Sequence, residues 1–205
     1  TENFLDALDH YMDFYGDLQE KDLPGTDTWI TEIADAGCGG DSWAPTCMEM
    51  VREADMVGRF TRRAKGILFH NTLAASAYGY LDLETRLPNP QYWVAYLYKQ
   101  LIGTEVFDAK EPIREGAHVY AFSRKDGKPG YVYVAVNNSQ EETSVTLPGT
   151  AEVYHLTGES LRSRTALLNG KPLVCSNNAP IPEVAPVTVS GSMTLPAVSV
   201  SFIVV

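Results

Sequence analysis

Glu32 is the residue whose type and position most clearly allow chemistry. It lies near the end of a short apolar run, residues 28–34, and directly before the glycine-rich segment ADAGCGG. In a parallel α/β barrel, catalytic groups project from the carboxyl ends of strands, and a carboxylate there suits nucleophilic or acid–base chemistry on a sugar. The alternative interpretation is a solvated glutamate at a strand end. Trp29 and Trp43 fit either an aromatic platform for a sugar ring or the hydrophobic core.

A second set of polar and aromatic side chains follows the next apolar run. His70, Asn71, Tyr78 and Tyr80 lie within residues 70–82, where a predicted strand gives way to a loop. Hydrogen-bonding and aromatic groups at such a place are useful for sugar recognition, and Asn71 is a candidate substrate-binding residue. For His70 the alternative is a structural histidine whose hydrogen bonds are satisfied within the fold.

Two of the three cysteines, Cys38 and Cys47, lie nine residues apart in the segment GCGGDSWAPTC. We expect a local disulfide that pins this loop, with two free thiols as the alternative. A zinc site is disfavoured because no CxxC or HxxxH pair accompanies them, and neither a metal nor another cofactor is expected. Cys175 is left over and is predicted to be buried or to pair with a cysteine of another chain.

Two further segments raise the question of anion binding. Successive backbone N–H groups of AGCGGD could form an anion-binding nest, although such a segment is more often a tight turn. It contains neither GxGxxG nor a P-loop pattern, so a nucleotide site is disfavoured. The basic run RFTRRAK, residues 59–65, invites a heparin-binding interpretation. Its place at the end of a predicted helix favours helix capping and a solvated face instead.

The first predicted helix, residues 4–18, is amphipathic. Its apolar face is expected to comprise Phe4, Leu8, Tyr11, Met12, Tyr15 and Leu18. Its opposite face is expected to comprise Asp6, Asp9, Asp13 and Asp17.

Strands and helices alternate after this helix. Residues 28–34 and 66–71 are predicted strands, and residues 46–65 form a helix between them. Asn89 and Pro90 are a favourable N-cap and first-turn pair for a third helix, which runs to residue 102 and stops at a glycine. The order is α-β-α-β-α. Because two strands cannot make a stable parallel sheet alone, this half resembles the end of a larger α/β domain.

Residues 103–205 have a different pattern. Short alternating runs recur, separated by turn signals; the runs are AHVYAFSR, GYVYVAVN, TSVTLP, AEVYHLT, TALLN, VTVSG and SVSFIVV. This pattern is typical of an antiparallel β-sandwich. The chain is therefore predicted to be α/β plus all-β, with one domain over residues 1–102 and a second over residues 103–205.

Composition and charge exclude several classes of protein. With 205 residues, of which 44% are hydrophobic, the chain can bury a core, and it has no apolar run of about 18 residues that would cross a membrane. Its formal net charge of −10 makes it a poor candidate for nucleic-acid binding, which depends on neutralising phosphates. The N-terminal residues lack the pattern of a signal peptide, so an exported protein would already have lost its signal.

Four segments together resemble one family. The segment WITEIADAGCGG resembles the nucleophile strand and following loop of glycoside hydrolase family 79, the heparanase-like β-glucuronidases. The resemblance continues through HNTLAASAYGYLD, RLPNPQYWVAYLYKQLIGTEVF and GSMTLPAVSVSFIVV. It extends over most of the chain from Thr28 onward.

The resemblance implies a (β/α)8 TIM barrel followed by a β-sandwich, of which this chain supplies the last part of the barrel and most of the sandwich. It implies a retaining mechanism with Glu32 as nucleophile. The family's acid/base glutamate lies on an earlier strand, typically in an Asn-Glu pair, and no such pair occurs in this chain. The resemblance therefore implies a partner, an N-terminal chain of the same enzyme that completes the barrel and supplies the acid/base.

Three further residues match the family's substrate contacts. Cys38 and Gly39 match loop positions whose backbone N–H groups hold the sugar carboxylate, and Tyr78 matches a tyrosine whose hydroxyl assists them. Two departures matter: Gly37 stands where heparanase has an aromatic residue, and Cys38 replaces a glycine. Loss of the aromatic side chain leaves the detailed substrate open.

These observations lead to two candidate functions for the chain. The first is a retaining glycosidase that cleaves β-D-glucuronides, exo or endo, and is secreted or periplasmic. Its substrate would be a glucuronide or a glycosaminoglycan-like chain, and the charge of −10 favours a small glucuronide over a sulfated polyanion. The second is a non-catalytic carbohydrate-binding or structural β-sandwich protein. A half-barrel standing alone would expose large apolar faces, which favours the first function with a companion chain.

Overall fold

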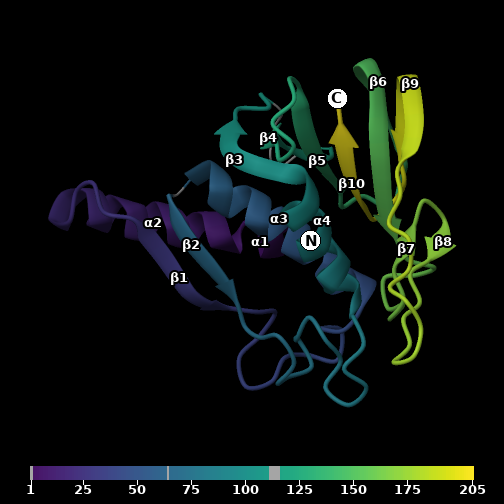
Figure 1. The fold of residues 1–205 in the computed structure, drawn as a ribbon. Coiled ribbons are helices and arrows are strands. Elements are labelled where there is room, and N and C mark those ends of the chain that lie inside the picture. Colours follow the sequence, from purple (N-terminus) through teal and green to yellow (C-terminus); the bar gives the residue numbers. More distant parts are fainter. Residues whose placement is uncertain (1, 64, 111–115) are drawn as a thin grey trace.

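The computed structural model describes residues 2–63, 65–110 and 116–205, and helices and strands alternate in its first half (Figure 1). The elements before residue 102 are α1 (Glu2–Leu5), α2 (Ala7–Asp22), β1 (Thr28–Ile33), α3 (Cys47–Arg63), β2 (Gly66–His70) and α4 (Pro90–Leu101). The predicted α-β-α-β-α order is confirmed, with the first helix divided at Asp6. Asn89 holds the N-cap position of α4, but its side chain donates to the carbonyl of Gly79 instead of capping the helix.

β1 and β2 pair in parallel, so both strands end at the same edge. The register places Ile30 beside Leu68 and Ile33 beside His70. β1 therefore has one extra residue between the two pairs, in the stretch that carries Glu32. An irregularity of this kind re-aims a side chain and is frequent next to active sites.

The second half forms a larger antiparallel sheet. Among the described residues, eight strands pair in the order β3-β4-β5-β10-β6-β7-β8, with β9 also paired to β6. The strands are β3 (Ile102–Phe107), β4 (His118–Arg124), β5 (Tyr131–Asn137), β6 (Thr143–Thr157), β7 (Leu167–Leu168), β8 (Lys171–Pro172), β9 (Val187–Leu195) and β10 (Ser199–Val204). The antiparallel pairing is confirmed. Two predicted strands, TSVTLP and AEVYHLT, form the single long strand β6.

Alternate residues of the central strands enter two separate apolar clusters. Val134 and Phe202 belong to a cluster that the helices cover, whereas Ala135 and Ile203 belong to a second cluster with residues of β6 and β9. Because side chains alternate across a strand, the clusters lie on opposite faces of the sheet. The description of these strands as a sandwich stays a prediction.

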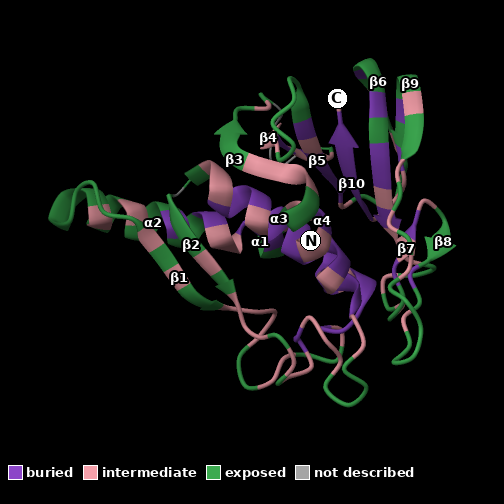
Figure 2. Ribbon diagram, in the orientation of Figure 1, coloured by how far each residue is buried: buried purple, intermediate pink, exposed green. Residues whose placement is uncertain are grey.

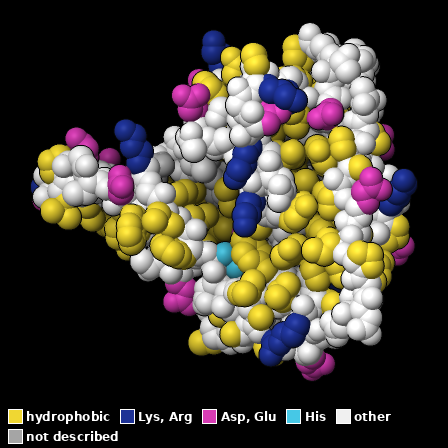
Figure 3. Space-filling model, in the orientation of Figure 1, with side chains coloured by type: hydrophobic (Ala, Val, Ile, Leu, Met, Phe, Trp, Pro, Cys, Tyr) yellow, Lys and Arg dark blue, Asp and Glu magenta, His cyan; other side chains and the backbone are white. Residues whose placement is uncertain are grey.

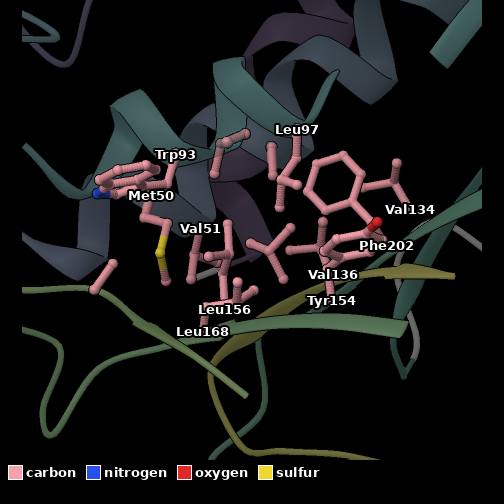
Figure 4. Close-up of a cluster of buried hydrophobic side chains, with 14 of the residues drawn as sticks. Met50, Val51, Trp93, Leu97, Val134, Val136, Tyr154, Leu156, Leu168 and Phe202 are labelled. Atoms are coloured by element: carbon pink, nitrogen blue, oxygen red, sulfur yellow. The ribbon is translucent and has the colours of Figure 1, made fainter. Parts of the chain in front are cut away.

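The main core lies between the helices and this sheet (Figure 4). α3 and α4 contribute side chains that are almost fully buried against β5, β6 and β10. The labelled members are Met50, Val51, Trp93, Leu97, Val134, Val136, Tyr154, Leu156, Leu168 and Phe202. This shared core fixes α3, which reaches from the sheet to the end of the β1–β2 pair.

The predicted domain boundary, between residues 102 and 103, falls within the first residues of β3. α4 ends at Leu101, and the chain enters β3 directly, so Gly103 is a strand residue instead of a helix stop. A side-chain carbon at Gly103 would lie 2.4 Å from Ser123 Oγ and 3.0 Å from the carbonyl oxygen of Arg124, so β4 approaches β3 closely at this glycine. The division into residues 1–102 and 103–205 stays a prediction.

The predicted orientation of the first helix is wrong. Of the six residues assigned to its apolar face, Met12 is buried, whereas Tyr11 and Tyr15 are 64% and 59% exposed. Asp6 and Asp9, assigned to the solvated face, are buried. Figure 2 shows exposed residues along α2, in contrast to the wholly buried β10.

Arg59 is the physical reason for this orientation. The interpretation of the basic run 59–65 as a solvated face is wrong for this residue, whose side chain is fully buried. Arg59 Nε donates to Asp55 at 2.6 Å, and Nη1 donates to Asp6 at 2.9 Å and to Asp9. A buried guanidinium requires acidic partners, so the aspartates of the first helix turn inward. Arg63 adds ion pairs to Asp9 and Asp13.

Candidate active site

Glu32 and Asn71 meet at the edge where β1 and β2 end. Asn71 Nδ2 donates to Glu32 Oε1 at 2.6 Å, and the backbone N–H of Asn71 donates to the carbonyl of Ile33 at 2.9 Å. The backbone bond aligns the two strand ends, and the side-chain bond orients the carboxylate. Because Glu32 is exposed, its second oxygen is open to a ligand.

Tyr78 completes this arrangement. The same Asn71 amide lies 3.2 Å from the hydroxyl of Tyr78, whose ring is buried. One amide group therefore connects Glu32, Asn71 and Tyr78, all candidate site residues in the sequence, by hydrogen bonds.

The loop after β1 contains three consecutive residues with positive φ: Cys38 at 58°, Gly39 at 105° and Gly40 at 87°. Cys38 thus adopts the left-handed conformation that glycine adopts at lower cost. A side-chain carbon at Gly40 would lie 2.7 Å from Tyr78 Cδ1, so this loop packs directly on the tyrosine ring. Asp35 fixes the loop by accepting the backbone N–H of Asp41 at 2.8 Å. The contact of Cys38 and Gly39 with a substrate carboxylate stays a prediction.

The expected disulfide is not formed. Cys38, Cys47 and Cys175 are all free, with Cys38 exposed and Cys47 buried. Cys47 begins α3 and directs its sulfur towards the sheet, 3.6 Å from the carbonyl of Thr165. Burial raises the pKa of the Cys47 thiol to about 11, so it stays protonated at neutral pH. Cys175, predicted to be buried, is half-buried against the main core.

The two tryptophans near Glu32 have different surroundings. Trp29 is 58% exposed on β1, with its ring centroid 6.2 Å from that of Phe69 on β2. Trp43 is half-buried against Phe4. A sugar-platform role for either ring stays a prediction.

A buried polar group lies behind the site, and its glutamate, Glu53, was not identified from the sequence, unlike His70 and Tyr80. His70 Nδ1 lies 3.2 Å from Glu53 Oε2, and Nε2 lies 2.9 Å from the carbonyl of Tyr78. Tyr80 donates its hydroxyl proton to Glu53 Oε1 at 2.7 Å, and its ring stacks on the imidazole with centroids 4.0 Å apart. His70 is therefore a structural histidine with both nitrogens bonded, as the alternative interpretation had it.

Burial and neighbouring charges set the protonation of the two buried glutamates of α3, Glu49 and Glu53. Arg52 Nε donates to Glu49 Oε2 at 2.6 Å, and burial raises the pKa of Glu49 to about 7. Burial also acts to raise the pKa of Glu53, but the hydrogen bond and charge of His70, with Arg52, hold it below its usual value. The spacing of Glu49, Arg52 and Glu53 places them on one helix face, which was the available signal in the sequence.

Comparisons with known proteins show similarity to glucuronidases and heparanases. The chain is 29% identical over 218 residues to baicalin-β-D-glucuronidase of Scutellaria baicalensis, a match that covers 100% of this chain and 41% of that protein. The resemblance to glycoside hydrolase family 79 is confirmed. Heparanase of Gallus gallus is 27% identical over 228 residues, covering 100% of this chain and 43% of the relative. The chain thus spans less than half the length of these relatives. No family model matches it.

A solved structure has a similar fold. It is a 4-O-α-L-rhamnosyl-β-D-glucuronidase from Fusarium oxysporum 12S in complex with Rha-GlcA, with a TM-score of 0.67 and 15% identity. The match covers 89% of this chain and 44% of that chain. The described part of this chain therefore has a fold found within glycoside hydrolases. No helix among the described residues is both long and apolar enough to cross a membrane.

Proposed function

We propose that this chain is the C-terminal part of a retaining glycosidase that cleaves β-D-glucuronides, with Glu32 as its nucleophile. The observation that carries the proposal is the hydrogen-bonded set of Glu32, Asn71 and Tyr78 at the edge of a parallel strand pair. Catalytic groups occupy this edge in parallel α/β barrels. The similarity to glucuronidases supports the reaction class.

The reaction would proceed in two steps. A carboxylate oxygen of Glu32 attacks the anomeric carbon and forms a glycosyl ester, while the bond from that carbon to the aglycone oxygen breaks. The acid/base residue donates a proton to the leaving oxygen, then takes a proton from the water that cleaves the ester. Asn71 holds one oxygen of Glu32 and so orients the other. In a retaining site the two carboxyl groups lie about 5–5.5 Å apart.

The substrate would be recognised by neutral donors. The Tyr78 hydroxyl and the backbone N–H groups of Cys38 and Gly39 would bind the uronate carboxylate, because hydrogen bonds to a charged group are worth about 1.5–3 kcal/mol each. The nearest arginines in the sequence, Arg52 and Arg59, are engaged by buried acidic side chains. With a net charge of −10, the chain favours a small glucuronide over a sulfated polyanion.

A companion N-terminal chain would supply the acid/base and the remaining barrel. Exposed apolar side chains support this part of the proposal. Trp29, Ile67 and Phe69 are 58%, 40% and 43% exposed on the β1–β2 pair, and Figure 3 shows hydrophobic side chains gathered there. Soluble proteins rarely expose such a patch without a partner. We also propose that the assembled enzyme is secreted or periplasmic.

Turnover of paired substrates tests the proposal. The assembled enzyme should hydrolyse an aryl β-D-glucuronide in preference to the corresponding glucoside, and Glu32→Gln should abolish turnover because an amide cannot form the glycosyl ester. Glu105→Gln is the matched control, since Glu105 is also an exposed strand glutamate. Near-normal activity of Glu32→Gln would refute the nucleophile assignment. Glucuronide binding without turnover by the wild type would favour the non-catalytic alternative.

A further inference from the structure

One imidazole ring is connected to both ends of the loop that carries the site. His70 directly precedes Asn71 in the chain, and its Nε2 lies 2.9 Å from the carbonyl oxygen of Tyr78. Asn71 and Tyr78 are the two residues that contact each other and, through Asn71, Glu32. The position of the His70 ring is therefore coupled to Tyr78 by a hydrogen bond and to Asn71 by the chain.

Glu53 and Tyr80 fix that ring. Glu53 comes from α3, which is packed on the large sheet, and its two oxygens bind His70 and Tyr80 separately. The tyrosine ring stacks on the imidazole with an interplanar angle of 21°. The loop is thus joined to a rigid helix through a group of buried side chains.

The partners of His70 determine its protonation. A carbonyl oxygen and an ionised carboxylate are both acceptors, so both ring nitrogens must donate, and the imidazole must carry a proton on each. The groups that act on it are Glu53 and Glu49 from α3 and the stacked Tyr80 from its own loop, and Arg52 lies beside Glu53. Burial acts to lower the pKa of His70, but the hydrogen bond and charge of Glu53 more than offset it, so the pKa is raised.

A metal site is the competing explanation for these side chains. One donor atom each from Glu49, Glu53 and His70 lie within 4.8 Å of one another. However, Arg52 binds Glu49 through two nitrogens, and both oxygens of Glu53 already have donors. An ion would have to displace these bonds, so the arrangement favours a hydrogen-bonded structural group.

We propose that Glu53, His70 and Tyr80 form a positioning unit that aligns Tyr78 and Asn71 for a carboxylate-bearing sugar. This inference rests on the proposed function and adds to it the residues that set its selectivity. The three residues touch neither the substrate nor the reacting atoms; they act through the backbone of Tyr78 and the residue next to His70.

The fold offers a matched control for this unit. On another side of α3, Asp55 Oδ1 accepts the Tyr120 hydroxyl at 2.8 Å and contacts His118 Nδ1, so a second acid, histidine and tyrosine are joined, here through a single carboxylate oxygen. Tyr80→Phe and Tyr120→Phe each remove one buried hydroxyl from an α3 carboxylate. The partner of Tyr80, Glu53, is linked through His70 to the loop that carries Tyr78, whereas the partner of Tyr120, Asp55, contacts His118.

The test is kcat/KM of the assembled enzyme for an aryl glucuronide and the matching glucoside. We expect Tyr80→Phe and Glu53→Gln to reduce the glucuronide-to-glucoside ratio roughly tenfold, about the effect of one misplaced hydrogen bond, while Tyr120→Phe leaves it unchanged. Because the His70 pKa is raised, the alignment of Tyr78 and Asn71 is complete at low pH, where His70 is protonated. This alignment is lost as pH rises through the His70 pKa. In Glu53→Gln this loss of selectivity should occur at lower pH than in the wild type.

Several results would overturn the inference. An unchanged ratio and pH profile in both variants would do so while leaving the proposed function intact, provided the wild type depends on Glu32. An equal effect of Tyr120→Phe would reduce the unit to a general stabilising role. Activation by added Zn²⁺, or loss of activity with a chelator, would favour the metal explanation. If the wild type hydrolyses neither substrate, the proposed function fails and the inference fails with it.

Discussion

Replacement of Arg59 by methionine should destabilise the protein strongly. Arg59 is fully buried and binds Asp55, Asp6 and Asp9, so Arg59→Met leaves three buried or nearly buried carboxylates without their shared cation. Removing one partner of a buried ion pair costs about 3–5 kcal/mol. With an m-value of about 2 kcal/mol/M, the urea midpoint should fall on the order of 2 M.

Arg63→Met is the matched control, because it removes an arginine one helical turn further along the same face. Arg63 is about one-third exposed and its partner Asp13 is mostly exposed, while its other partner, Asp9, keeps the ion pair with Arg59. Pairs of this kind are worth about 0–1 kcal/mol, so the control should shift the midpoint by less than about 0.5 M. Urea unfolding of the assembled protein followed by circular dichroism, with hydrogen exchange of α2 peptides, would measure both changes.

The pH dependence of the unfolding free energy gives a second check on the role of Arg59. Burial acts to raise the pKa of Asp55, but His118 and Arg59 more than offset it, so its pKa lies below the usual value. A depressed pKa contributes stability above the unfolded pKa of about 4, and that contribution is lost as pH falls through the folded pKa. The difference in unfolding free energy between the wild type and Arg59→Met should therefore become smaller as pH falls below about 4. A loss under 1 kcal/mol at neutral pH, or one equal to that of Arg63→Met, would refute the account of α2.

Two further variants test the site. Tyr78→Phe keeps the buried ring and removes the hydroxyl. Its kcat/KM for an aryl glucuronide should fall by roughly one to two orders of magnitude, and its kcat/KM for the glucoside should fall less. Equal losses on both substrates would show that Tyr78 does not recognise the carboxylate. Gly40→Ala places a carbon 2.7 Å from the Tyr78 ring at a φ of 87°, so it should raise KM for the glucuronide and cost about 1–3 kcal/mol in unfolding free energy. Gly37→Ala, whose added carbon meets nothing within 4 Å, is its control, and matching effects would contradict the packing argument.

The local geometry of the site could be predicted from the sequence. Apolar runs separated by a helix predict parallel strands, whose carboxyl ends lie at one edge, and the structure has Glu32 and Asn71 at that edge. The glycine-rich loop predicted a tight turn or an anion-binding nest, and the structure has three consecutive residues with positive φ there, Cys38, Gly39 and Gly40. These features depend on short stretches of chain.

The orientation of the first helix could not be predicted, because it depends on a residue about 50 positions away. The apolar residues Tyr11 and Tyr15 suggested a core-facing side, but the buried charge of Arg59 outweighs that preference and draws Asp6 and Asp9 inward. Hydrophobic periodicity counts apolar side chains and contains no information about a distant buried cation.

Long-range packing also determines whether Cys38 and Cys47 form a disulfide. The nine-residue spacing of Cys38 and Cys47 allowed a local disulfide, yet the first turn of α3 directs Cys47 towards Thr165 in the other half of the chain. The buried network of Glu53, His70 and Tyr80 likewise requires α3 to lie beside the loop after β2. Such contacts between distant segments follow from the packed fold.

Trapping the covalent intermediate tests the central claim most directly. In a 2-deoxy-2-fluoro-β-D-glucuronyl fluoride, the 2-fluorine slows both steps of a retaining reaction, while the good fluoride leaving group keeps the first step faster than the second, so the glycosyl ester should accumulate on the assembled enzyme. The account predicts one label per active site, found by peptide mass spectrometry on Glu32, and no label in Glu32→Gln. Turnover of a glucuronide together with a label on any other carboxylate would contradict it.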